Sequence, residues 1–440
     1  MEEARQSKKD HVLVVPFPAQ GHINPMLQLC KLLSTKGIKP TLSLTVCISK
    51  SINTTTIPTH HGPPIQLRPI SDGYDEGGLH QAESIEAYLD SIRTDGPKTL
   101  TQIIKKLSEE GDPVTAIIYD GFMPWVFNVA QQFGLARVLF FTESCTVNSI
   151  YYHVQRGLIQ LPLMGPGPST VSVPGAPELQ PWETPSFLHK FGSFPVWFEG
   201  VLRQYNDIDH WRVGTIGPTI PSYYLDKSLE DEKDHNFQLF KPNTTSCKNW
   251  LDTKPRNSVI YVSFGSLIKL TEEQFEEVAW SLKNGRYSFL WVVRELEQAK
   301  LPKGFIDEIF GQGLVVGWAS QLEVLAHEAT GCFVTHCGLN SILEAFCLGV
   351  PIVGVPRWTD QATNAKFVED VWGVGVRTKV DKKGIVRREN LDECIRKIME
   401  GDIREEIMKN VAKWKKLAKQ TLSEGGSSYK NIDEFVAYLA

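Results

Sequence analysis

The sequence predicts an α/β protein with two doubly wound, largely parallel β-sheets. Short apolar runs alternate with amphipathic helical patterns in the first half of the chain, which is the rhythm of β-α-β units. The same rhythm starts again in the second half. The chain has 440 residues, more than the roughly 250–300 residues at which a single hydrophobic core stops growing. We therefore expect two Rossmann-like domains.

The first half contains four predicted strands, at residues 11–17, 41–46, 116–120 and 138–141. The first is a continuous apolar run and is followed by a loop and an amphipathic helix over residues 25–36, which Gly37 ends. A second helix follows residues 116–120 and ends near Gly134. The carboxyl ends of parallel strands meet at one edge of the sheet, where folds of this class bind ligands.

The second half contains six predicted strands, at residues 259–264, 289–293, 314–316, 332–335, 351–355 and 374–377. Helical patterns lie between them, as at residues 271–283 and 364–371. The polar segment 226–248 predicts a linker between an N-terminal domain, residues 1–225, and a C-terminal domain, residues 249–440. A last helix, about residues 427–440, follows the turn at residues 424–428.

Composition excludes several classes of protein. The chain carries 46 basic and 51 acidic residues, so we expect no nucleic-acid partner. No apolar run approaches the ~18 residues of a membrane helix, and the charged N-terminus does not predict a signal peptide. Eight cysteines lack CxxC pairs and zinc spacing. These features predict a cytoplasmic protein with reduced thiols, no membrane association and no metal site.

Residues 318–361 carry the strongest functional signal and read WASQLEVLAHEATGCFVTHCGLNSILEAFCLGVPIVGVPRWTDQ. In length (361 − 318 + 1 = 44 residues) and in the order of its polar residues, this segment resembles the nucleotide-sugar signature box of plant UDP-dependent glycosyltransferases. The resemblance covers nearly the whole chain. It is closest to the branch of glucosyltransferases that act on small acids, thiohydroximates and some terpenoids or steroids. It implies the GT-B fold, in which two Rossmann-like domains face each other across a cleft and the last helix packs back on the N-terminal domain.

Within this box, the strand-to-helix turn at residues 336–341 suits a diphosphate. Gly338 permits close approach of the backbone to a ligand. Asn340 and Ser341 are favoured at a helix N-terminus, whose free N–H groups and dipole attract anions. Glu344 follows Asn340 by four residues on the same helix face. A carboxylate about one turn, ~5.4 Å, along the helix can accept hydrogen bonds from both ribose hydroxyls.

Other residues of the box supply the remaining contacts with the donor. Trp318 suits stacking on uracil, Gln321 suits the base or ribose, and His336 suits the phosphate. Taken singly, Trp318, His336 and Glu344 also fit structural roles, and only their ordered series favours donor binding. The resemblance implies that Asp360 and Gln361 bind sugar hydroxyls, with Gln typical of glucose donors. The expected donor-binding residues are Thr142, Ser266, Trp318, Ala319, Gln321, His336, Gly338, Leu339, Asn340, Ser341, Glu344, Asp360 and Gln361.

A catalytic pair is expected at the edge of the N-terminal sheet. His22 lies in the loop PAQGHINP after the first strand, and Asp120 ends a later strand of the same sheet. A carboxylate bonded to Nδ1–H would fix the tautomer of His22 and stabilise its imidazolium. The other nitrogen would then take the proton of an acceptor hydroxyl. Either residue alone would also fit a plain turn, but the loop resembles the family's catalytic loop. Gly21 is expected to contact the acceptor, and Pro25 suits the first helical turn.

Three departures from the family pattern bear on activity. Ser320 replaces a proline of the box, and Leu339 stands where the family has tryptophan. Residues 205–217 are shorter than in relatives, which carry an additional strand and helix there. Loss of an internal strand would expose backbone groups, so we expect impaired folding or a rearranged sheet edge.

These observations predict an enzyme that transfers glucose from UDP-glucose, with inversion, to a hydroxyl, carboxyl or thiol group of a small apolar plant metabolite. UDP-glucose is the co-substrate, and neither a metal nor a further cofactor is expected. The resemblance implies a monomer. The alternative is a nucleotide-sugar-binding protein whose turnover is impaired or lost through Leu339 and the shortened segment. A nicotinamide-dependent dehydrogenase and a phosphate-loop NTPase are disfavoured, because their glycine motifs are missing. The Pro- and Gly-rich residues 162–185 are expected to cover an acceptor pocket.

Overall fold

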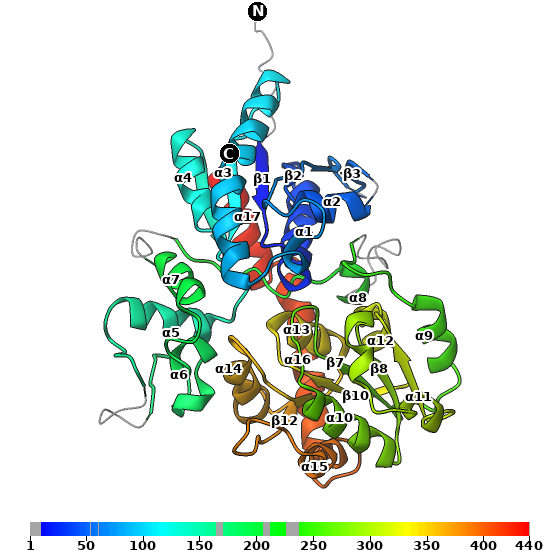
Figure 1. The fold of residues 1–440 in the computed structure, drawn as a ribbon. Helices are drawn as coiled ribbons and strands as arrows, with labels where there is room; N and C mark the ends of the chain where they lie inside the picture. Colours follow the sequence, from blue (N-terminus) through cyan, green and yellow to red (C-terminus); the bar gives the residue numbers. More distant parts are fainter. Residues whose placement is uncertain are drawn as a thin grey trace, which may run out of the picture.

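The described residues form two six-stranded β-sheets, one in each half of the chain (Figure 1). This computed structural model describes residues 10–52, 54–59, 61–163, 170–205, 212–225 and 237–439. The N-terminal sheet has the strand order β3-β4-β2-β1-β5-β6, and the C-terminal sheet has the order β12-β11-β10-β7-β8-β9. The predicted fold class, two doubly wound domains, is confirmed.

The strands of the N-terminal sheet are parallel except for β3, which runs antiparallel to β4. They are β1 (His11–Val15), β2 (Lys39–Leu42), β3 (Thr56–Ile57), β4 (Ile65–Leu67), β5 (Ala116–Asp120) and β6 (Ala136–Phe140). Its helices are α1 (Gln20–Thr35), α2 (Val46–Ile52), α3 (Ile85–Glu109), α4 (Trp125–Gln132), α5 (Cys145–Gln155), α6 (Ser186–His189), α7 (Pro195–Arg203) and α8 (Ser222–Leu225).

The C-terminal sheet is entirely parallel. Its strands are β7 (Val259–Ser263), β8 (Ser288–Val292), β9 (Gly313–Val316), β10 (Thr330–Thr335), β11 (Ile352–Gly354) and β12 (Gly375–Arg377). Its helices are α9 (Thr244–Leu251), α10 (Glu272–Asn284), α11 (Phe305–Glu308), α12 (Gln321–Ala326), α13 (Leu339–Leu348), α14 (Gln361–Lys366), α15 (Arg388–Met399), α16 (Arg404–Leu422) and α17 (Ser427–Leu439).

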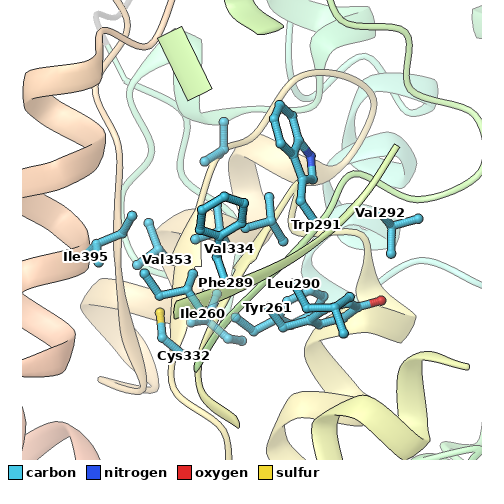
Figure 2. Close-up of a cluster of buried hydrophobic side chains, with 14 of the residues drawn as sticks. Ile260, Tyr261, Phe289, Leu290, Trp291, Val292, Cys332, Val334, Val353 and Ile395 are labelled. Carbon is cyan, nitrogen blue, oxygen red and sulfur yellow. The ribbon is translucent and has the colours of Figure 1, made fainter. Parts of the chain in front are cut away.

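The central strands are apolar along their whole length because helices cover both faces of each sheet. Figure 2 shows the resulting core of the C-terminal domain, where Trp291 and Phe289 of β8 pack with Val334 of β10. In the N-terminal sheet every residue of β1 is buried, between β2 on one side and β5 on the other. Local signals agree with this arrangement, as where the Thr271 hydroxyl caps α10 by accepting from the Gln274 N–H.

Each sheet changes the direction of its strand order once, and such a switch point is where doubly wound sheets bind ligands. In the N-terminal sheet the switch lies between the neighbouring strands β1 and β5. In the C-terminal sheet it lies between β7 and β10. The predicted base and its partner follow the first pair of strands. The predicted phosphate-binding turn follows the second pair.

The chain crosses between the domains at its C-terminal end. Helix α17, red in Figure 1, lies against the N-terminal domain, where Phe435, Val436 and Leu439 pack on the core. Lys36 Nζ contacts Asp433 Oδ1 at 2.6 Å. The expected return of the last helix is thus observed. Residues 226–236 of the expected linker lie outside the described residues, while Cys247 at its far end is already buried in the C-terminal core.

Several predicted boundaries were wrong. Helix α1 begins at Gln20 rather than near Pro25, and residue 46 begins α2 rather than ending a strand. Helix α3 was not predicted, although it is 25 residues long. It contains Gly96 and Pro97, which normally interrupt helices. A Cβ at Gly96 would lie 2.7 Å from the Trp125 ring, so glycine is required by close packing of α3 on α4.

In the part of the chain that the structure describes, β6 is the edge strand on the β5 side of the N-terminal sheet. Among the described residues no further strand pairs with β6, whose residues are only partly buried. Residues 206–211 lie outside the described part of the chain. From residue 212 onward the chain approaches α17, and the Asn431 amide donates to the Thr215 carbonyl over 2.7 Å. Impaired folding stays a prediction.

Candidate active site

One cavity is lined by both domains and contains nearly all the predicted site residues. From the N-terminal domain it is lined by Gly21, His22 and Thr142, and from the C-terminal domain by Ser266 and the signature box. The lining residues of the box are Trp318, Ala319, Gln321, His336, Gly338, Leu339, Asn340, Ser341, Glu344, Asp360 and Gln361. Asp120 is not at the cavity wall but lies behind His22, fully buried. The cleft therefore brings together the predicted catalytic residues of the N-terminal domain and the predicted donor-binding residues of the C-terminal domain.

The His22 imidazole is held by two neighbours, one at the end of β5 and one just after β6. Its Nδ1 lies 2.8 Å from Asp120 Oδ2 and 3.1 Å from the Thr142 hydroxyl. The other carboxylate oxygen of Asp120 accepts the Phe122 N–H over 2.8 Å. With Nδ1 engaged in this way, Nε2 of the neutral ring is the nitrogen that can accept a proton. His22 and Asp120 lie this close together because β1, which precedes His22, and β5, which ends at Asp120, are adjacent in the sheet.

Electrostatics adjust His22 towards a stronger base. Burial alone would lower the pKa of His22, but the carboxylate of Asp120, with Glu143 and Asp360, outweighs burial and raises the pKa above 6.5. Rings of Phe17 and Phe122 lie edge-on to the imidazole, with centroids 5.3 Å and 5.2 Å away. Aromatic packing and the Asp120 contact together fix the orientation of the ring.

The first turn of α1 carries His22, which had been expected in a loop. Pro25 lies inside this helix and has no N–H to donate to the carbonyl of Gly21, four residues earlier. That free carbonyl instead accepts a hydrogen bond from the Asn340 side-chain amide of the C-terminal domain. The proline thus has a function other than the expected one, because it leaves an acceptor for a contact across the cleft. Asn340, expected at a phosphate, makes this contact in the structure.

The N-terminus of α13 is open towards the cavity. Gly338 is its N-cap and no side chain caps it, so Asn340 and Ser341 lie in the first turn rather than at the cap. The first-turn N–H groups of a helix have no intrahelical acceptor. They and the helix dipole form a site suited to a diphosphate. The position of this turn agrees with the prediction, and its donors come from the backbone.

His336 fits beside this turn because two neighbours are glycines. A Cβ at Gly338 would lie 2.6 Å from its Nε2, and one at Gly265 would lie 2.9 Å from its Cε1. Burial lowers the pKa of His336 to about 4, so the ring is neutral at neutral pH. A neutral imidazole offers the phosphate a hydrogen bond rather than a charge. Ser266, the other expected phosphate contact, follows Gly265 and lines the cavity.

Glu344 and Gln321, the residues expected at the ribose, form a polar pair in the cavity. Gln321 Nε2 lies 2.7 Å from Glu344 Oε2 and 3.0 Å from the Ser341 hydroxyl. Burial raises the pKa of Glu344 to about 7. A buried carboxyl group with so few partners is prepared to accept hydrogen bonds from a ligand's hydroxyls. Asn340 and Glu344, which the sequence spacing placed on one helix face, both line the cavity.

The Trp318 ring lines the cavity and is anchored from behind. Its Nε1–H donates to Gln238 Oε1 over 3.0 Å, and its ring centroid lies 4.9 Å from that of Phe240. The neighbouring Leu239 N–H donates to Gln20 Oε1 at the start of α1 over 2.7 Å. The indole therefore has a fixed orientation, which suits stacking on a planar base. The anchoring segment joins the two domains and was not predicted to take part.

The end of the box, residues 358–361, forms a turn that we term the sugar loop. Asp360 accepts hydrogen bonds from Asn364 Nδ2 over 2.6 Å and from the Thr359 hydroxyl over 2.8 Å. Gln361 Oε1 accepts the N–H groups of Arg357 and Trp358 over 3.0 and 2.9 Å, and among the described residues its Nε2 has no hydrogen-bond partner. Burial raises the pKa of Asp360. Both polar ends face the cavity that His22 lines.

Glu143 was missed by the sequence analysis. It follows Thr142 directly and lines the cavity. Burial and the carboxylate of Asp120 raise its pKa to about 8. The only sequence signal was a carboxylate in an otherwise apolar strand-to-helix connection. The surrounding wall is aromatic, from Phe17, Phe122, Tyr151, Trp197 and Trp358, and no Lys or Arg is among the described lining residues.

Some expectations find no counterpart among the described residues. None of residues 162–163 and 170–185 lines the cavity, so the expected cover over the acceptor pocket is not seen there; residues 164–169 are outside the described part. No group of three metal-ligating side chains occurs within the described ranges, and the absence of a cofactor stays a prediction. No helix in the described part is both long and apolar enough to cross a membrane.

Comparison with known proteins places the chain in a family. Residues 223–416 match the family model described as "UDP-glucoronosyl and UDP-glucosyl transferase", and residues 9–43 match "Glycosyltransferase, N-terminal domain". The chain is 44% identical to UDP-glycosyltransferase 74F2 of Arabidopsis thaliana, over 98% of this chain and 99% of that protein. That alignment runs over 460 positions, more than the 440 residues of this chain, so this chain lacks residues that the relative has.

Further relatives extend the agreement to structure. The chain is 44% identical to Mogroside I-E synthase of Siraitia grosvenorii over 98% of both chains. The crystal structure of Os79 from O. sativa in complex with UDP superimposes with a TM-score of 0.89 at 37% identity, covering 98% of this chain and 100% of that one. This chain belongs to the plant family 1 UDP-dependent glycosyltransferases, with the GT-B fold, and is a UDP-dependent glucosyltransferase.

Proposed function

We propose that the chain transfers glucose from UDP-glucose to a hydroxyl or carboxyl group of a small apolar plant metabolite, with inversion at the anomeric carbon. The supporting observation is a single cavity with the His22–Asp120 pair on one wall and the open N-terminus of α13 on the other. One wall provides a base oriented by a carboxylate, and the opposite wall provides donors for a diphosphate.

The reaction needs one displacement. The acceptor oxygen bonds to the anomeric carbon while the bond from that carbon to the β-phosphate oxygen of UDP breaks. The acceptor proton passes to Nε2 of His22, and Asp120 stabilises the imidazolium that forms. Charge that develops on the leaving UDP is stabilised by the first-turn N–H groups of α13. A carboxylate acceptor has no proton to lose, and His22 then acts by positioning.

Two observations support an apolar acceptor. The wall around His22 is aromatic, with the Phe122 and Trp197 centroids 5.0 Å apart, and aromatic rings favour flat apolar ligands. Relatives include a flavonol 7-O-beta-glucosyltransferase of Arabidopsis thaliana and Crocetin glucosyltransferase 2 of Crocus sativus. Since no Lys or Arg is among the described lining residues, a hydroxyl is favoured over a carboxylate at this wall.

The test is product formation. The purified chain is incubated with UDP-glucose and a mixture of flavonols, triterpenoid alcohols and aromatic acids, and products are identified by mass spectrometry. We expect released UDP in equal amount to a hexosylated acceptor, with a β-linkage by NMR. UDP binding without any conjugate would contradict the proposed transfer and support the binding-only alternative. An α-linked product would contradict inversion.

A further inference from the structure

A segment of the N-terminal domain is hydrogen-bonded in both directions to the sugar loop. The Ser186 N–H donates to the Thr359 carbonyl over 2.8 Å, and the Thr359 N–H donates to the Ser186 hydroxyl over 2.8 Å. Ser186 is 2% exposed and is the first residue of α6. The backbone of the loop is thus bonded to a side chain of the other domain.

Glu183 strengthens the same connection from the preceding turn. Its carboxylate lies 2.6 Å from Arg377 Nη1 and 3.2 Å from Lys366 Nζ. Its carbonyl accepts the Thr363 hydroxyl over 2.8 Å. The Glu183 side chain is only 7% exposed, so these ion pairs are protected from solvent screening. Together they attach the segment to Thr363 and Lys366 of α14, the helix that begins at the end of the sugar loop, and to Arg377 of β12.

The sugar loop needs this support because its backbone is strained. Thr359 has φ of 52°, a left-handed conformation that is unfavourable for a β-branched residue and persists only when its surroundings impose it. The hydroxyl of the same residue donates to Asp360 Oδ1 over 2.8 Å. The preceding Trp358 packs on Phe187 and Trp197 of the N-terminal domain, with centroids 6.1 and 5.6 Å away. The conformation of the loop therefore depends on residues of the acceptor domain.

We propose that Ser186 and Glu183 form an interdomain clamp that holds the sugar loop in the conformation that receives the hexose of the donor. Neither residue lines the cavity, so they act as positioning residues through Thr359, Asp360 and Gln361. The inference rests on the proposed function, in which Asp360 and Gln361 bind the sugar. Through the clamp, recognition of the sugar depends on the contact between the two domains at Ser186 and Glu183.

The uridine end of the donor site is built independently of this clamp. Trp318 is bonded to Gln238, and Gln321 is bonded to Ser341 and Glu344. None of these hydrogen bonds involves residues 183–186. The clamp should consequently affect the contribution of glucose to binding and leave that of UDP unchanged. That separation distinguishes a positioning role from a general contribution to stability.

The experiment compares Ser186→Ala with the matched control Ser428→Ala. Ser428 is also 2% exposed, and its hydroxyl also joins the two parts of the fold, donating to the Gly217 carbonyl over 2.6 Å. Affinities for UDP and for UDP-glucose are measured by calorimetry, and kcat/KM is measured with UDP-glucose and its epimer UDP-galactose.

For Ser186→Ala we expect UDP affinity within twofold of wild type, and a loss of about tenfold in the extra affinity that glucose contributes, since one buried hydrogen bond is lost. Discrimination against UDP-galactose should fall in parallel. Ser428→Ala should change neither ratio. The proposal is overturned if Ser186→Ala weakens UDP and UDP-glucose equally, or if its ratios match those of Ser428→Ala.

A second variant covers the case in which Ser186→Ala does not fold. Glu183→Gln keeps the size of the side chain and removes the charge that pairs with Arg377. It should show the same selective loss for UDP-glucose, and unchanged ratios would overturn the clamp. The calorimetric comparison needs no turnover, so failure of the clamp can be distinguished from failure of the proposed function. If the proposed function fails, the wild-type protein forms no product.

Discussion

The two walls of the cleft differ in how their residues are distributed along the chain. The donor wall comes almost entirely from residues 318–361, whose polar side chains are bonded to one another, as Gln321 is to Ser341 and Glu344. The acceptor wall collects His22 and Glu143 from separate segments, with Asp120 behind His22 and aromatic side chains around them. Gln321, Ser341 and Glu344 of the donor wall are thus preorganised by contacts within one segment, whereas the acceptor wall depends on how the whole N-terminal domain folds.

Replacement of His22, on the acceptor wall, should have the largest effect on turnover among the substitutions compared. His22→Ala removes the base and should lower kcat for a hydroxyl acceptor by about 10²–10⁴-fold, because alanine cannot take the acceptor's proton. The measurement is initial rate with saturating UDP-glucose. His153→Ala is a suitable control, since His153 lies on α5, outside the cavity lining. Unchanged turnover of His22→Ala would refute the assigned base.

Asp120→Asn should have the next largest effect and should change the pH profile. His22 is a base only when neutral, so activity falls as pH drops through its pKa, which the Asp120 carboxylate raises above 6.5. Asparagine cannot stabilise the imidazolium, so we expect roughly hundredfold lower kcat and an acidic limb displaced to lower pH. The measurement is kcat/KM from pH 5 to 9, roughly one unit beyond the usual range of His on each side. An acidic limb at the same pH as in wild type would contradict the pairing.

Glu344→Gln tests the donor wall alone. We expect UDP-glucose affinity to fall about tenfold, since a hydrogen bond to a charged group contributes about 1.5–3 kcal/mol. The pKa of Glu344 is about 7, so its carboxylate forms above that pH and wild-type affinity should weaken as pH falls below it. The variant should lack this dependence. Calorimetry at several pH values measures both effects, and identical pH dependence in the two proteins would exclude Glu344 as the ribose acceptor.

Glu143→Gln should give the smallest effect, and it tests whether Glu143 disfavours charged acceptors at the acceptor wall. Para-hydroxybenzamide and para-hydroxybenzoate have nearly the same size and shape, but only the benzoate carries a charge on the group opposite the hydroxyl. Glu143, with a pKa of about 8, is ionised above that pH and should then repel the benzoate. We expect the variant to raise the relative kcat/KM of the benzoate about threefold to tenfold, about 1 kcal/mol of removed repulsion. Equal selectivity in both proteins would place Glu143 away from the acceptor.

The sequence predicted the donor wall better than the acceptor wall because the residues of the donor wall lie close together in the chain. The donor wall is one contiguous segment whose residue order encodes its geometry, and its expected residues all line the cavity. His22 and Asp120 were predictable because both follow strands that β-α-β order brings to one edge. Glu143 could not be found in this way, since its environment depends on carboxylates from Asp120 and Asp360, which lie far away in sequence.

Contacts across the cleft were the least predictable. Pro25 was read as a helix start, but its effect is to free the Gly21 carbonyl for Asn340. Ser186 and Thr359 pair over a sequence separation of 173 residues, and no local pattern marks either partner. The long helix α3 was missed because Gly96 and Pro97 normally interrupt helices, whereas here Gly96 is required by the Trp125 ring.

Titration of UDP into the folded wild-type chain and into His22→Ala tests the central claim most directly. We expect both proteins to release heat with a single site and with dissociation constants within twofold of each other. That result follows if the α13 tip and Glu344 bind UDP while the imidazole serves only the acceptor. No heat with folded wild-type protein, or loss of UDP binding in His22→Ala, would contradict the division of the cleft into a donor wall and an acceptor wall.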